Sequence, residues 1–163
     1  MDIRGRYLGC MKTKIFEGTI KWTLLEEVDV LGSLHDSAAV VSYMAGAFDA
    51  YPEQEQVWVV MMNRKGLPKG RVMISLGSQS SAIVQPREVF RAAMIASASS
   101  VIVAHNHPSG DPSPSSADFQ ITKQLADAGR VVGIELLDHV ICGESSADPM
   151  GVGHYSFRGA GRL

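Results

Sequence analysis

Two continuous apolar runs with a helical pattern between them limit the folds open to this chain. The runs SSVIVAHN (residues 99–106) and GIELLDHVICG (residues 133–143) have the length and composition of strands buried on both faces of a sheet. The segment between them, DFQITKQLADAG, predicts a helix over residues 118–129 that ends at Gly129 as its C-cap. Strands that alternate with helices in this way indicate an α/β or α+β domain with three layers.

The remaining patterns predict further elements of the same architecture. The segment DSAAVVSYMAGAFDAY (residues 36–51) predicts a helix with Asp36 as its N-cap candidate, and Pro86 opens another helix over residues 86–98. Compact apolar segments predict the other strands, at residues 19–28, 57–63 and 70–77, and residues 80–84 could add one more. Residues 1–18 are expected to form an N-terminal tail or arm, and residues 19–163 a single domain. Tyr155 and Phe157 are the expected anchors of the Gly-rich C-terminal segment.

Composition narrows the class of protein. The chain has 163 residues, with 45% hydrophobic and 20% charged residues, as in a globular domain with a real core. Neither a membrane span nor a signal peptide is recognisable. Cys10 and Cys142 are too far apart to suggest a disulfide framework. We therefore expect a cytoplasmic protein without membrane association.

The charge balance argues against a dedicated nucleic-acid-binding protein. The formal net charge is −2, whereas such proteins usually carry a basic surface or stripe. The one basic cluster comprises Arg64, Lys65, Lys69 and Arg71, in NRKGLPKGR. Its glycines and proline predict a hairpin turn, so binding to nucleic acid is open but not supported by charge.

His105, His107 and Asp118 form the most informative constellation in the sequence. Two histidines spaced two apart at the end of a strand point to the same side. A loop with three of the seven prolines could hold Asp118 against them, and two histidines with one carboxylate match the three protein ligands of a catalytic zinc. The alternative is purely structural, because Ser115-x-x-Asp118 also has the spacing of a helix capping box. His139, between apolar neighbours, is expected to be a core histidine bonded to Asp138 or a backbone carbonyl.

The full pattern resembles a known family. HNHPSGDPSPSSAD (residues 105–118) is similar to the H-x-H-x7-S-x2-D motif of JAMM (MPN-type) metalloproteases. The segments PREVF, VIVAHNHPSGDPSPS, LLDHVICG and YSFRGAG resemble the bacterial RadC family in order and spacing, over residues 53–158. Gln85 departs from this family, which often has histidine there, and no helix-hairpin-helix segment is recognisable.

The resemblance implies a three-layer α/β/α, cytidine-deaminase-like JAB/MPN fold with a mixed central sheet. It also implies a zinc-dependent peptidase that cleaves a peptide or isopeptide bond in a peptide or protein substrate. Carried over, His105, His107 and Asp118 are the ligands of one zinc ion per chain, and Ser115 stabilises the tetrahedral intermediate. Glu55 occupies the position of the family's general base, with Glu53 as a weaker rival.

Other functions remain open from the sequence. The RadC resemblance also implies a DNA-repair-associated or DNA-binding accessory role without peptidase activity. A deaminase is disfavoured, because the chain lacks the H-x-E and P-C-x-x-C parts of that signature. An exposed strand edge or the N-terminal arm could support a homodimer.

Overall fold

The computed structural model describes residues 32–77 and 84–163. In chain order the elements are α1 (Ser37–Tyr43), β1 (Gln56–Met62), β2 (Pro68–Leu76), α2 (Pro86–Ile95), β3 (Ser100–Asn106), α3 (Ser116–Val132), β4 (Glu135–Cys142) and β5 (His154–Ser156). The expected tail at 1–18 and strand at 19–28 lie outside the described residues, as does most of the segment at 80–84.

In the part of the chain that the structure describes, five strands form one mixed sheet in the order β2-β1-β3-β4-β5. Strands β3 and β4 are parallel, and α3 provides the crossover that such a pair requires. The other neighbours are antiparallel. The expectation of a mixed central sheet is therefore confirmed.

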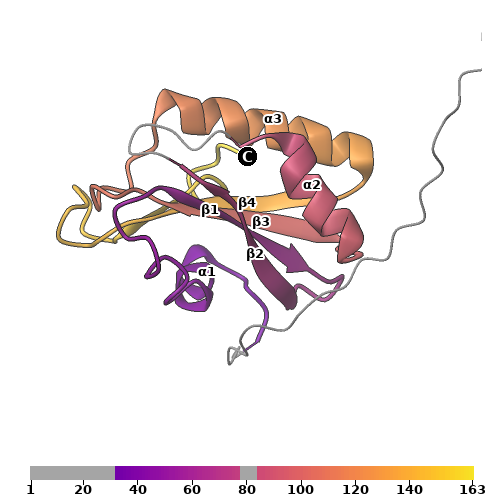
Figure 1. Cartoon of the computed structure of the whole chain (residues 1–163), viewed down its shortest axis with the longest axis horizontal. Coiled ribbons are helices and arrows are strands. Elements are labelled where there is room, and N and C mark those ends of the chain that lie inside the picture. Colours follow the sequence, from indigo (N-terminus) through magenta and orange to yellow (C-terminus); the bar gives the residue numbers. More distant parts are fainter. Residues whose placement is uncertain (1–31, 78–83) are drawn as a thin grey trace, which may run out of the picture.

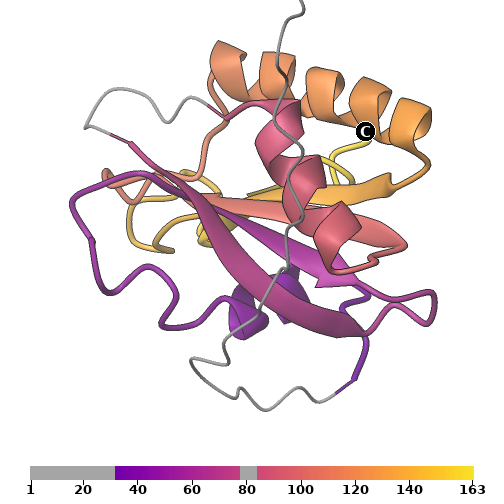
Figure 2. The ribbon, with the colours of Figure 1, turned by 45° about the vertical axis from the view of Figure 1, so that its right-hand side comes forward.

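Helices cover both faces of this sheet, which gives the three expected layers. Figure 1 shows α2 and α3 on one face and α1 on the other, and the turned view of Figure 2 shows the same arrangement. Side chains of β1 and β3 alternate between the two faces. Val60 and Ile102 pack with the cluster around α1, whereas Val59 and Val103 pack with the cluster under α2 and α3. This double burial explains why both strands are apolar throughout.

The segment with the basic cluster forms the expected hairpin between β1 and β2, with Lys69 and Arg71 on β2 itself. The side chain of Asn63 accepts hydrogen bonds from the backbone N–H groups of Lys65 and Leu67. Gly66 has a φ of 72°, a conformation that glycine adopts without a steric penalty. Asn63 and Gly66 therefore fix the tight connection.

Helix α1 begins as predicted, because the Asp36 side chain accepts a hydrogen bond from the N–H of Ala39, but it ends at Tyr43, and the rest of the predicted segment forms turns. The predicted C-cap of α3 is wrong. The helix continues past Gly129 to Val132 and ends at Gly133, which has a φ of 72°. At Gly129 a Cβ would lie 2.5 Å from the carbonyl oxygen of Ile134. Gly129 thus allows the helix to approach the following chain closely, and does not terminate it.

The C-terminal segment adds β5 to the sheet edge, an element that the sequence pattern did not predict. The anchor role expected of Phe157 is confirmed, because its side chain is fully buried. Tyr155 is half-buried, with its ring edge against Phe157. Among the described residues, no helix is both long enough and apolar enough to cross a membrane.

Candidate metal centre

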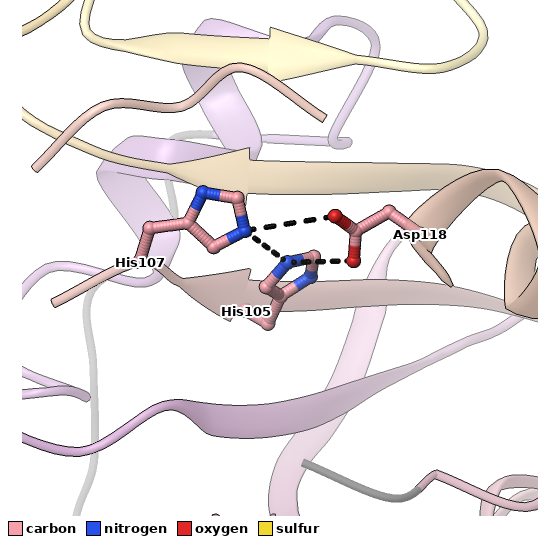
Figure 3. Close-up of side chains that lie close together, drawn as sticks. All are labelled: His105, His107 and Asp118. Carbon is pink, nitrogen blue, oxygen red and sulfur yellow. Dashed lines mark hydrogen bonds and ion pairs between the residues drawn. The ribbon is translucent and has the colours of Figure 1, made fainter. Parts of the chain in front are cut away.

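The structure brings His105, His107 and Asp118 together above the carboxyl end of β3. His105 is the penultimate residue of that strand, and His107 follows its last residue. Asp118 is the third residue of α3, at the helix end that faces the strand terminus. Figure 3 shows the two imidazole rings and the carboxylate converging from these elements.

The distances between donor atoms fit a small metal ion. The two histidine Nε2 atoms are 3.1 Å apart. His105 Nε2 is 3.3 Å from Asp118 Oδ1, and His107 Nε2 is 3.7 Å from Asp118 Oδ2. Zinc holds nitrogen ligands at about 2.0–2.1 Å, so donor atoms in a tetrahedral site lie about 3.3 Å apart. The group is therefore close enough to hold a metal ion.

Asp118 serves the helix and the site at once. Its Oδ2 accepts hydrogen bonds from the backbone N–H of Ser115 at 2.7 Å and from the Ser115 hydroxyl at 2.6 Å. Its own N–H donates to Ser115 Oγ at 3.2 Å, which completes the capping box. These bonds orient the carboxylate so that Oδ1 faces His105. The capping interpretation and the ligand interpretation of this pair are thus compatible.

Charge complementarity keeps the Asp118 carboxylate ionised. Burial alone would raise the pKa of Asp118, but its hydrogen bonds with His105, His107 and Ser115 outweigh burial and hold this pKa well below its usual range. An ionised carboxylate is the form that binds a metal.

His107 is oriented by the proline-rich loop. Its Nδ1 lies 2.7 Å from the carbonyl oxygen of Asp111, which only accepts hydrogen bonds, so Nδ1 carries a hydrogen. Burial would lower the pKa of His107, but Asp118, the Asp111 carbonyl and the charge of Glu55 together raise it. The neutral form of this ring presents the lone pair of Nε2 to the site.

His105 is buried, with 2% of its surface exposed, and bonds to a second buried histidine. Its Nδ1 lies 2.8 Å from Nε2 of His139, whose Nδ1 lies 2.6 Å from the hydroxyl of Thr122. His139 is therefore the hydrogen-bonded core histidine that was expected, but its ring partners differ from the prediction. The Asp138 carboxylate bonds to the backbone N–H of His139, not to its ring.

Glu55 lies at the same site, beside the start of strand β1, which pairs with β3. It directly precedes β1, and it lines a cavity together with His105 and Asp118. Its side chain is half-buried, whereas Glu53 is exposed and does not line this cavity. The structure thus places Glu55, and not its rival Glu53, beside the candidate ligands. Apolar side chains form most of the remaining cavity wall: Val57, Val84, Val103, Ile121 and Leu125.

Two contributors to the site were missed by sequence reasoning. The carbonyl of Asp111 leaves no trace in a side-chain pattern. Thr122 left a signal, because it is a polar residue four positions after Asp118, on the face of α3 that the amphipathic pattern assigns to the core. Glu88 lies outside this site and caps α2, since its carboxylate accepts a hydrogen bond from the N–H of Gln85 at 3.4 Å.

Two side chains of the basic hairpin are engaged within the domain. Lys69 donates to the carbonyl oxygens of Ala96 and Ser97. Arg71 donates to the carbonyl of Tyr43, and its guanidinium lies over the Tyr43 ring. The DNA-associated role stays an untested prediction, with no added support from this cluster.

Comparisons with known proteins agree with the motif. The model of the family described as "RadC-like JAB domain" matches residues 34–161. A UPF0758 protein of Caldanaerobacter subterraneus is 52% identical over 94 residues, which is 58% of this chain and 40% of the relative. A UPF0758 protein of Syntrophomonas wolfei is 44% identical over 115 residues, or 71% of this chain and 49% of the relative. A third, from Symbiobacterium thermophilum, is 43% identical over 125 residues, or 77% and 50%.

The chain spans about half the length, or less, of these curated relatives. The shared part includes the histidines, the capping box and the strands that carry them, because the family match runs from α1 to the residues after β5. On this evidence the chain belongs to the RadC-like JAB domain family.

Proposed function

We propose that the domain is a zinc-dependent hydrolase that cleaves a peptide or isopeptide bond in a peptide or protein substrate. One observation carries the proposal, namely the convergence of His105, His107 and Asp118 within ligand distance of one another. Glu55 in the same cavity adds a group able to accept a proton.

The donor set suits zinc, because two neutral imidazoles and one carboxylate are a recurrent three-ligand set that leaves a fourth position open. A zinc ion there would supply a Lewis acid and lower the pKa of water in that open position to about 7. Glu55 would take the proton from this water and pass it to the leaving amine.

Ser115 is proposed to assist at the same place. Its hydroxyl donates to Asp118 and lies at the N-terminus of α3, where the helix dipole favours negative charge. It could turn from the carboxylate toward an oxyanion that forms at the scissile carbonyl.

The direct experiment combines metal analysis with cleavage assays. The protein is purified without added zinc, and its metal content is measured by mass spectrometry beside a His105→Ala variant. We expect about one zinc per chain in the wild type and loss of zinc in the variant, because three protein ligands are needed to hold it. Retention of one equivalent by His105→Ala would reject the ligand assignment.

Cleavage is measured with a mixture of peptides and lysine-linked isopeptides. Glu55→Gln should keep the metal and lose turnover by a factor of about 10²–10⁴, the usual contribution of a general base. Glu53→Gln is the matched control, since this exposed side chain does not line the cavity. Equal turnover by wild type and Glu55→Gln would reject the general-base role.

A further inference from the structure

A series of buried hydrogen bonds connects the candidate ligands His105 and Asp118 by way of strand β4. It runs from His105 on β3 to His139 on β4 at 2.8 Å, and then to the Thr122 hydroxyl on α3 at 2.6 Å. From Thr122 it continues to the backbone carbonyl of Asp118 at 2.5 Å. The series therefore begins at one ligand and ends at the backbone of another.

The direction of every bond in this series follows from its last acceptor. A carbonyl oxygen only accepts, so the single hydrogen of the Thr122 hydroxyl is donated to Asp118. Thr122 must then accept from Nδ1 of His139, which carries a hydrogen. Among the described residues, the ring nitrogens of His139 bond to His105 and Thr122 and not to a carboxylate. In the neutral ring with a hydrogen on Nδ1, Nε2 is a lone-pair acceptor.

The lone pair on Nε2 of His139 determines which ring nitrogen of His105 carries the hydrogen. Only Nδ1 of His105 can supply the hydrogen for the 2.8 Å bond. With its hydrogen on Nδ1, the neutral form of the His105 ring has its lone pair on Nε2, the atom that faces His107 and Asp118. His107 reaches the same tautomer through the Asp111 carbonyl. In these neutral tautomers both Nε2 lone pairs face the Asp118 carboxylate, an arrangement that either a proton on Nε2 or a cation at the centre satisfies.

We propose that His139 and Thr122 are positioning residues, which hold His105 in the tautomer that binds a metal through Nε2. The inference rests on the proposed metal site. The stacking of His139 on Phe157, with ring planes 9° apart, holds the second imidazole in place. Threonines in helices often donate a hydrogen bond to the carbonyl four residues earlier. Here the Thr122 hydroxyl also accepts a hydrogen bond from Nδ1 of His139, so the tautomer of His139 depends on the position of Thr122 in α3.

Threonine variants provide the first test. Thr122→Val has the same shape without a hydroxyl, and Thr122→Ser keeps the hydroxyl. Zinc affinity of the full chain is measured by competition with a chromophoric chelator, and circular dichroism verifies the fold. Thr122→Val should weaken zinc binding by about 10–100-fold, as expected when an outer hydrogen-bond partner is lost. Thr122→Ser should bind close to wild type, and an equal loss in both variants would overturn the proposal.

Histidine variants give an independent comparison. His139→Phe keeps a ring against Phe157 but removes the acceptor for His105, whereas His139→Gln offers a side-chain carbonyl at a similar position. Zinc binding should weaken in His139→Phe and recover in part in His139→Gln. Wild-type affinity in both His139→Phe and Thr122→Val contradicts the positioning role.

The tautomers are read directly from the metal-free protein by ¹⁵N-edited NMR of its histidine rings. We expect His139 to be protonated at Nδ1 and unprotonated at Nε2. A hydrogen on Nε2 of His139 would overturn the proposal whether or not zinc binds. If instead the wild type shows this tautomer but no zinc affinity, the proposed function fails while the hydrogen-bond assignment stands.

Discussion

Replacing Ser115 by alanine tests whether the capping box holds the candidate ligand in place. The change removes two hydrogen bonds, from the hydroxyl to Asp118 Oδ2 and from the Asp118 N–H to Oγ. The bond from the backbone N–H of residue 115 to the carboxylate, 2.7 Å long in the wild type, needs no side chain and remains.

The magnitude follows from these bonds. Loss of an N-cap serine costs about 1 kcal/mol, and a hydrogen bond to a charged group is worth about 1.5–3 kcal/mol. Ser115 is exposed to solvent, which screens the second contribution. We therefore expect the unfolding free energy of the metal-free protein to fall by about 1–2 kcal/mol. Zinc affinity should fall by about 10-fold or more, because Asp118 loses its orientation.

The assay is urea unfolding followed by circular dichroism, together with a zinc titration. Ser116→Ala is the matched control, since Ser116 is the neighbouring exposed residue at the first position of α3, and we expect a change within about 0.5 kcal/mol. Ser115→Thr retains a capping hydroxyl and should restore most of the stability. The reasoning is refuted if Ser115→Ala and Ser116→Ala have the same unfolding free energy and zinc affinity.

Three further predictions concern packing, reactivity and pH. Gly129→Ala should lower the unfolding free energy by about 1–3 kcal/mol, because the added methyl group overpacks against the carbonyl oxygen of Ile134. This loss should exceed the gain from the higher helix propensity of alanine. A variant that is more stable than the wild type in urea unfolding would contradict the close approach of Gly129 to Ile134. Burial raises the pKa of the Cys142 thiol to about 12. When the native protein is alkylated and then analysed by peptide mapping, Cys142 should therefore be unmodified. Alkylation of Cys142 in the native protein would argue against its burial. Without metal, the pKa of His107 is raised because Asp118, Asp111 and Glu55 outweigh its burial. Its contribution to stability is then fully present below about pH 6.5 and is lost as the pH rises through the raised pKa. Thermal unfolding in the presence of a chelator should show a fall in stability from pH 5 to pH 8. If a His107→Gln variant shows the same fall, the pH dependence arises from a group other than His107.

The sequence predicted the parts of the fold that local chemistry determines. Asp36 and Pro86 mark helix starts because an N-cap side chain and a fixed φ act on adjacent residues. The end of α3 escaped prediction because Gly129 and Gly133 are both plausible caps. Only the contact of Gly129 with the chain at Ile134 distinguishes them, and this contact is tertiary.

In the candidate site, too, the sequence pattern predicted some features, whereas others depend on tertiary contacts. The family motif brought His105, His107 and Asp118 to attention, and the structure places their donor atoms together. The ring partner of His139 could not be predicted, because it depends on the register of β3 against β4, which pairs Val103 with His139. The same register pairs His105 with Ile141, so His139 lies two positions away along β4, on the sheet face that His105 also occupies.

The three candidate ligands lie on one continuous piece of chain, from β3 through α3, while Glu55 arrives from β1, fifty residues earlier. The loop that joins His107 to α3 is short, so the candidate ligand group is assembled once the β3–α3–β4 unit has formed. The proposed proton acceptor depends instead on a separate strand pairing. A single change at residue 55 would therefore remove the proposed proton acceptor and leave the candidate ligand group intact.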